Sequence, residues 1–120
     1  MTIRPLFAAL AVVALAGCAA DPAPNEQMRL TQQALEQANA VGAVASDSPE
    51  LKLAEDKFTQ ARADMADESY KDARMQAEEA ELDARLAEAR VLTRKSQEQL
   101  NVLNTRITRL RKQLQLGDAQ

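Results

Sequence analysis

The chain has 120 residues, a formal net charge of −3 and no histidine, and only 2% of its residues are aromatic. The length allows one domain at most, and the lack of histidine removes the commonest general base and metal ligand. Alanine, with 24 copies, is the largest part of the 46% hydrophobic content. Because alanine buries little surface, a compact monomer would have a thin core, which favours elongated helices or self-association.

The N-terminal segment is typical of an export signal. One positive charge, Arg4, precedes the eleven apolar residues Leu6–Ala16. A membrane-spanning helix needs about 20 such residues, whereas a short apolar run followed by small residues is the pattern of a secretory signal. We therefore predict that residues 1–17 are a signal peptide.

The sequence Leu15-Ala16-Gly17-Cys18 ends this segment and contains the only cysteine of the chain. An unpaired cysteine in an exported protein needs an explanation, and small residues before Cys18 are those of a lipobox. We expect cleavage between Gly17 and Cys18, and a diacylglyceryl and N-acyl lipid on Cys18 as the only attached group. Ala19, in place of an aspartate, favours the outer membrane, with the protein facing the periplasm. The alternative is an ordinary signal peptide in which Cys18 has no role.

Residues 18–25 contain Pro22 and Pro24, which favour an extended tether. A first helix is predicted over residues 26–44, because apolar residues recur at helical spacing. The predicted stripe consists of Leu30, Ala34, Ala38, Val41 and Ala45, broadened by Leu35. Residues 43–47 are the predicted break after this helix.

A second helix is predicted to begin near Ser48, which can cap it, with Pro49 at the first helical position. Alternatively, Asp47 is the cap and Glu50 completes a capping box. Steps of three and four residues then predict a coiled-coil seam. Its members are Leu51, Ala54, Phe58, Ala61 and Met65.

The segment Asp67-Glu68-Ser69 interrupts this seam with residues that favour turns and caps, so we predict a tight helical hairpin there. It has no glycine, which leaves a straight continuation as the alternative. The third helix repeats the seam spacing through Tyr70, Ala73, Ala77, Ala80, Ala84, Ala87 and Val91. We expect three neighbouring residues to widen its buried face, namely Leu82, Leu86 and Ala89.

Beyond Val91 the heptad phase shifts to a new row of large side chains: Leu100, Leu103, Ile107, Leu110 and Leu114. Neither proline nor glycine occurs from Glu50 to Leu116, so the third helix is predicted to run on to about Gln115. Its hairpin partner is too short to cover this row. An uncovered apolar stripe is typical of a protein contact, and we predict that these five residues bind a partner.

The predicted fold is therefore all-α: a short N-terminal helix, an antiparallel helical hairpin at about 49–91, and a coiled-coil arm at about 92–116. Together these form a helical domain over residues 26–116, and residues 117–120 form a frayed tail after a helix-stopping glycine.

Two clusters of charged residues are candidates for binding sites, one for a metal ion and one for anionic ligands. Glu78, Glu79, Glu81 and Asp83 are the densest acids, but their helical phases differ, so they indicate a solvated helix face and no metal site. The basic cluster comprises Arg94, Lys95, Arg106, Arg109, Arg111 and Lys112. It is either a solubilising flank of the coiled coil or a site for anionic envelope components such as lipopolysaccharide. We expect no nucleic-acid partner. Because no histidine is present to activate a serine, no catalytic residue is predicted and the chain is not expected to be an enzyme.

Three stretches carry a family resemblance: residues 49–54 (PELKLA), 70–73 (YKDA) and 77–87 (AEEAELDARLA). They are similar to the bacterial envelope lipoproteins grouped as domain of unknown function 4398. In that family a glycine usually precedes the hairpin tyrosine, whereas this chain has Glu68 and Ser69 before Tyr70. The resemblance implies small helical envelope proteins, often encoded beside OmpA-like peptidoglycan-binding proteins, and implies no catalytic residues.

These features predict an outer-membrane-anchored periplasmic lipoprotein that acts as a structural or adaptor module through its C-terminal arm. Its expected partners are the membrane, through the lipid anchor, and either a second copy or an envelope protein such as an OmpA-like peptidoglycan-binding protein. The alternative is a carrier or sensor subunit that binds anionic envelope components through the basic segment.

Overall fold

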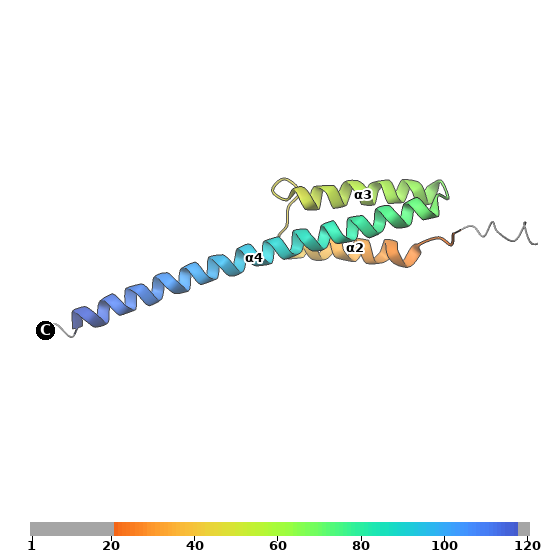
Figure 1. Cartoon of the computed structure of the whole chain (residues 1–120). Coiled ribbons are helices and arrows are strands. Elements are labelled where there is room, and N and C mark those ends of the chain that lie inside the picture. Colours follow the sequence, from red (N-terminus) through yellow and green to blue (C-terminus); the bar gives the residue numbers. More distant parts are fainter. Residues whose placement is uncertain (1–20, 118–120) are drawn as a thin grey trace, which may run out of the picture.

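The computed structural model describes residues 21–117, which form three helices: α2 (Asn25–Ala40), α3 (Pro49–Ala66) and α4 (Tyr70–Gly117). Helices α2 and α3 both pack on the first half of α4, and the second half of α4 extends alone from this bundle (Figure 1). The expected all-α fold, with a hairpin and a long last helix, is confirmed. The predicted signal peptide, Gly17, Cys18 and residues 118–120 lie outside the described residues.

The cross-helix contacts fix the directions of the helices. Gln27 on α2 contacts Glu81 on α4, and farther along α2 the carbonyl of Val41 accepts a hydrogen bond from Lys95, so these two helices run parallel. On α3, Glu50 pairs with Arg90 whereas Lys57 pairs with Asp83, so α3 and α4 are antiparallel. The bundle is therefore an up-down-up arrangement in which α2 and α3 both pack against α4.

Helix α2 is shorter than the sequence predicts, because it ends at Ala40 instead of Val44. Gly42 adopts φ +94, and the Ala43 amide donates to the Ala38 carbonyl, which closes a Schellman motif. Of the predicted stripe, Ala34, Leu35 and Ala38 are buried as expected, whereas Leu30 and Val41 are only half-buried. The buried residues of this helix are Thr31, Ala34, Leu35 and Ala38.

Helix α3 begins as expected, with Pro49 in the first turn and Ser48 as its cap. The amide of Leu51 donates to the Ser48 hydroxyl over 3.3 Å, so Ser48, and not Asp47, is the capping residue. The predicted seam is buried through Leu51, Ala54, Phe58 and Ala61. Its last member, Met65, is half-buried where the hairpin turns.

The α3–α4 connection is the tight turn that the sequence predicts. Glu68 takes the left-handed conformation at φ 58. The Ser69 amide donates to the Asp64 carbonyl over 2.8 Å and the Glu68 amide to the Met65 carbonyl over 3.3 Å. This is a second Schellman motif, with a glutamate at the position that glycine usually occupies.

Small side chains hold the core of α4. The predicted row is buried from its second member onward, which defines the alanine row (Ala73, Ala77, Ala80, Ala84, Ala87 and Val91). Its first member, Tyr70, is only half-buried at the hairpin. Because these side chains are short, the backbones of α2 and α3 approach α4 closely. None of the helices described is both long and apolar enough to cross a membrane.

The prediction that Leu82, Leu86 and Ala89 widen this buried face is wrong. Leu82 is 67% exposed and Leu86 is 44% exposed, and Ala89 is exposed as well. Leu82 lies two residues from Ala80 and from Ala84, which at 100° per residue places it on the opposite side of the helix. These three residues therefore face away from α2 and α3.

Candidate protein-binding surface

The arm, defined as residues 92–117 of α4, has no intrachain cover. Val91 is the last buried residue of the helix, and one turn farther on Lys95 Nζ donates a hydrogen bond to the Val41 carbonyl (2.7 Å) at the edge of the bundle. About 22 residues follow, which at 1.5 Å each is about 33 Å of isolated helix. Every residue from Leu92 to Gly117 is exposed.

The arm row (Leu100, Leu103, Ile107, Leu110 and Leu114) is exposed by 45–70%. The sequence-based prediction that the bundle leaves these side chains uncovered is confirmed. Full burial of a Leu or Ile side chain is worth about 1.5–3 kcal/mol, so covering the row with a partner helix would release a substantial free energy. A row with this spacing and exposure is typical of a surface that packs against another helix.

The arm row also continues toward the N-terminus of α4, over the bundle, which is not among the features predicted from the sequence. In steps of three and four residues it extends from Leu100 through Ser96, Thr93 and Ala89 to Leu86 and Leu82. The alanine row lies on the opposite side of α4, and its register continues into Arg94 and Glu98 on the arm. Helix α4 thus has two heptad rows: one binds α2 and α3, and the other faces solvent along its whole length.

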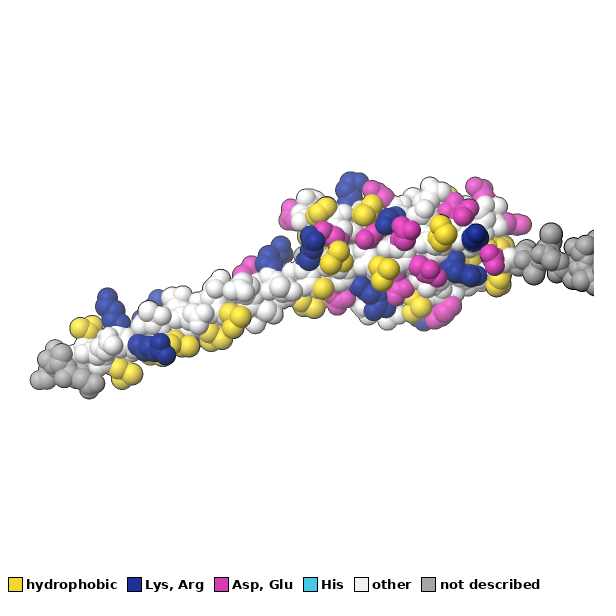
Figure 2. Space-filling model, viewed as in Figure 1, with side chains coloured by type: hydrophobic (Ala, Val, Ile, Leu, Met, Phe, Trp, Pro, Cys, Tyr) yellow, Lys and Arg dark blue, Asp and Glu magenta, His cyan; other side chains and the backbone are white. Residues whose placement is uncertain are grey.

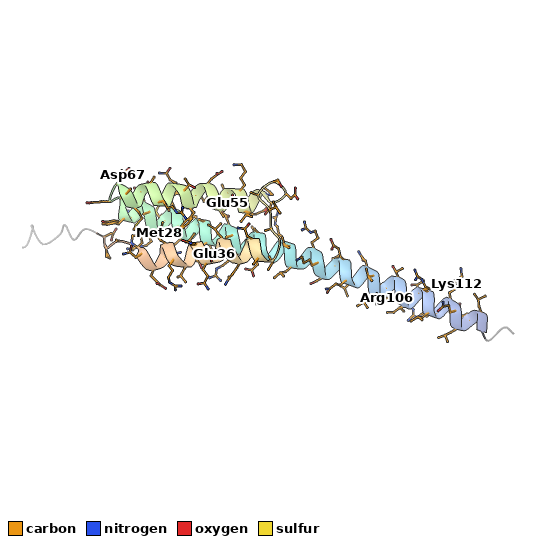
Figure 3. The ribbon with its side chains drawn as sticks, turned by 180° about the vertical axis from the view of Figure 1, so that it is seen from behind. Met28, Glu36, Glu55, Asp67, Arg106 and Lys112 are labelled. Atoms are coloured by element: carbon orange, nitrogen blue, oxygen red, sulfur yellow. The ribbon has the colours of Figure 1, made fainter. Side chains whose placement is uncertain are left out.

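Charge divides the molecule in the same way as the fold. Residues 21–90 carry sixteen acids and eight bases, whereas residues 91–117 carry six bases and one acid, Glu98. In Figure 2 the acidic side chains crowd the bundle, while basic and hydrophobic side chains dominate the arm. Figure 3 shows Glu36, Glu55 and Asp67 on the bundle and Arg106 and Lys112 on the arm, where no other helix lies beside them.

Three of the four clustered acids of α4 contact the other helices, so the cluster is not the solvated helix face that the sequence predicts. Lys57 of α3 forms ion pairs with Asp83 at 2.8 Å and Glu79 at 3.0 Å. These contacts, that with Asp83 first, raise the pKa of Lys57 above its ordinary value. Glu78 is exposed. Within residues 21–117 no three acidic or cysteine side chains are placed to share a metal ion.

Glu81, the fourth acid, links α2 to α4. It accepts a hydrogen bond from the Gln27 amide at 2.7 Å, and it pairs with Arg85 one turn along its own helix. The Gln27 hydrogen bond and then the Arg85 contacts lower the pKa of Glu81, against the opposing effect of burial. The acidic cluster therefore fastens the bundle together.

The described part of the tether lies at the end of the bundle opposite the arm (Figure 1). Arg74, in the first turns of α4, is 3.4 Å from the Pro22 carbonyl oxygen. Pro24 precedes the first residue of α2, so the predicted tether ends one residue earlier than expected, before Asn25. The tether therefore joins the bundle at one end of the elongated molecule, and the arm extends from the other end.

A three-helix bundle with an uncovered, heptad-patterned extension defines this chain as an all-α protein with a free coiled-coil arm. The chain belongs to the family described as Domain of unknown function (DUF4398), whose model matches residues 26–103. It is similar to the crystal structure of a DUF4398 family protein from Pseudomonas aeruginosa PAO1, with 62% sequence identity and a TM-score of 0.75. The similarity covers 82% of this chain and 100% of that chain. No curated protein matches the sequence.

Proposed function

We propose that this chain is a lipoprotein of the outer membrane, anchored through Cys18 and facing the periplasm, that acts as a structural or adaptor module. The bundle holds the arm, and the arm binds a protein partner by coiled-coil packing. The observation that carries the proposal is the exposure of the whole arm row, which no other helix of residues 21–117 covers. The resemblance to the family adds an envelope location and an OmpA-like peptidoglycan-binding protein as one candidate partner.

The anchor and the arm fit one another in this arrangement. Cys18 is separated from the bundle by a few residues that include Pro22 and Pro24, and residue 22 lies against Arg74 at the end of the bundle away from the arm. Helix α4 spans about 70 Å at 1.5 Å per residue. A lipid on Cys18 would hold one end of this rod at the membrane and leave the arm row accessible to other proteins.

The binding role is tested in cells by photo-cross-linking from position 110, with the double variant Leu103→Asp/Ile107→Asp as the disrupted form. Charges in the seam should abolish the cross-linked adduct. Val102→Asp is the matched control, because Val102 and Leu103 are both 52% exposed but Val102 lies on the other side of the arm. An adduct that survives the double variant, or that Val102→Asp removes equally, contradicts the proposal.

The anchor has a separate test. Labelling with radioactive palmitate should mark the full-length protein and should not mark Cys18→Ser. Fractionation should then find the labelled protein with outer membranes. If the unchanged protein takes up no label, the lipoprotein part of the proposal is wrong, and the binding role of the arm remains open to the test above.

The six exposed bases of the arm support one alternative, a carrier or sensor subunit for anionic envelope components. Lipopolysaccharide or peptidoglycan fragments would then bind through charges outside the seam, such as Arg109 and Lys112. The double variant Arg109→Glu/Lys112→Glu should abolish such binding, whereas Leu103→Asp/Ile107→Asp should spare it. The alternative fails if neither ligand binds the unchanged protein at low salt.

A further inference from the structure

The solvent-facing row of α4 extends from Met75 to Leu114 without a break in its three-four spacing. On the bundle the row contains the exposed apolar residues Met75, Leu82 and Leu86, interrupted by Glu79, and beyond the bundle it continues into the arm row. Its middle is small or polar, with Ala89, Thr93 and Ser96. A heptad row of this kind packs against another helix by inserting each side chain between four of the partner.

This row is complementary to itself when reversed. In an antiparallel pair of α4 helices, Leu82 lies opposite Ile107 of the second copy, and Leu86 lies opposite Leu103 of the second copy. The polar middle then meets itself, with Thr93 opposite Ser96. Each apolar residue of the bundle therefore finds a large apolar residue of the partner's arm, and no other helix is needed to cover the row.

A parallel pair in the same seam brings like charges together. Its flanking positions would place Glu78 beside Asp83, Arg85 beside Arg90 and Arg106 beside Arg111 of the second copy. Flanking charges of this kind select the orientation of coiled coils. Glu79, which occupies a seam position, would also face its own copy in a parallel pair, whereas in the reversed pair it faces Leu110.

The distribution of net charge favours the same orientation. The reversed pair lays the basic arm of each copy along the acidic bundle of the other. One like-charge contact remains at its flanks, between Arg85 and Arg106 of the second copy, and Arg85 is already paired with Glu81 of its own chain. Arm against arm would instead oppose six bases and one acid with the same set.

We propose that two copies of this chain associate through an antiparallel pairing of α4, in which the basic arm of each copy covers the outer face of the other's acidic bundle. This inference rests on the proposed binding role of the arm and names its partner as a second copy. At each end of the dimer, α2, α3 and α4 of one copy and the arm of the other copy form a four-helix arrangement. The N-terminal tethers of the two copies lie at opposite ends of the dimer. Lipid anchors of both copies in one membrane would therefore hold the long axis of the dimer along the membrane surface.

The test uses two full-length copies with different tags, expressed together. One carries Leu86→Cys and the other Leu103→Cys, and membranes are treated with a short bismaleimide. We expect a cross-linked dimer that contains both tags, and little product from cells that express either cysteine variant alone. Leu86→Cys with Val102→Cys is the matched control pair and should not cross-link, and neither should the chain whose only cysteine is Cys18.

Ionic strength gives an independent readout. Opposite charges attract across the reversed pair, so the yield of the Leu86→Cys/Leu103→Cys adduct should fall as NaCl rises, because salt screens the attraction. In a parallel pair the like charges repel, and salt would raise the yield of adducts within each single variant.

Efficient cross-linking of Leu86→Cys or of Leu103→Cys to itself would show a parallel pair and overturn the inference. Absence of any dimer, together with capture of a different protein from position 110, would overturn the inference and leave the proposed function standing. Absence of both products would contradict the inference and the proposed function together.

Discussion

The hydroxyl of Thr31 lies 2.8 Å from the carbonyl oxygen of Ala77 and joins α2 to α4 across a sequence separation of 46 residues. Thr31 is fully buried, and its hydroxyl oxygen is also 2.9 Å from the carbonyl of Gln27 on its own helix. Together with the Gln27–Glu81 and Lys95–Val41 hydrogen bonds, this buried contact fixes the register of α2 along α4.

Thr31→Val should lower the free energy of unfolding by about 1 kcal/mol, because valine keeps the shape of the side chain and removes the donor. Thr59→Val is the matched control. Thr59 also donates to a carbonyl one turn earlier, that of Glu55, but it is exposed and makes that bond within its own helix. Urea unfolding measures the free energy of unfolding of both variants, provided that its slope against urea concentration is unchanged. Equal losses of this free energy would mean that the hydrogen bond to Ala77 adds nothing to stability.

The lowered pKa of Glu81 makes part of the stability depend on pH. Folding lowers this pKa from its ordinary value of 4.5, chiefly through the hydrogen bond from Gln27. The unfolded chain therefore binds this proton at a higher pH than the folded chain does. The contribution of Glu81 is complete above about pH 4.5 and is lost as the pH falls through the folded value.

Glu81→Gln should therefore reduce the loss of unfolding free energy between pH 5 and pH 3, while the wild-type protein destabilises more steeply over about the same range. Glu55→Gln, an exposed residue of α3 (Figure 3), is the control. Urea midpoints at several pH values provide the measurement. A Glu81→Gln profile that runs parallel to the wild-type profile would contradict this reading of the Gln27–Glu81 contact.

Much of the fold was predictable, because local rules and tertiary packing agree in this chain. Ser48-Pro49 begins α3 as capping preferences require. The seam from Leu51 to Ala61 and the alanine row are buried because their spacing matches the helix period. The exposure of the arm row follows from length alone, since α3 has 18 residues and α4 has 48.

The failures have physical causes of their own. Large apolar residues are usually buried, and this rule favours Leu82 and Leu86 as core residues. Their side chains lie on the side of α4 opposite Ala80 and Ala84, however, and it is the alanine side that packs against α2 and α3. Thr31 was overlooked because a polar residue within an apolar stripe suggests a boundary. Its position between Met28 and Ala34 was a usable signal, since a threonine can satisfy its hydroxyl within its own helix.

Close approach of the helices makes the alanine row intolerant of larger side chains. Ala84→Leu should destabilise the protein by about 1–3 kcal/mol, because the added atoms have no space between α4 and its neighbours. Ala89→Leu is the matched control: the same substitution in the same helix, five residues on, at an exposed position. Its effect should stay within about 0.5 kcal/mol.

Thermal unfolding followed by circular dichroism distinguishes these two variants. Only Ala84→Leu should lower Tm, and a drop of similar size in both would mean that the two faces of α4 are equally covered. Ala89→Leu also adds a large side chain to the row proposed to bind the second copy. An unchanged or increased yield of the Leu86→Cys/Leu103→Cys adduct in its presence would agree with the antiparallel pairing.

The two Schellman motifs found within residues 21–117 differ in the residue that takes the left-handed conformation. Gly42 ends α2 with φ +94, and Glu68 ends α3 with φ 58. A side chain in this conformation costs about 1–2 kcal/mol relative to the right-handed form, and part of any gain from glycine is offset by the greater freedom of the unfolded chain. Glu68→Gly should therefore raise the free energy of unfolding by about 0.5–1 kcal/mol.

Gly42→Ala is the reciprocal change and should lower it by about 1 kcal/mol, since an added Cβ is strained at φ +94 even though the nearest atom, Lys95 Nζ, lies 3.8 Å away. Urea unfolding of both variants provides the measurement. A loss of stability in Glu68→Gly would mean that the glutamate side chain contributes more to the turn than its backbone strain removes. In that case the departure from the family's glycine at this turn is a stabilising feature of this chain.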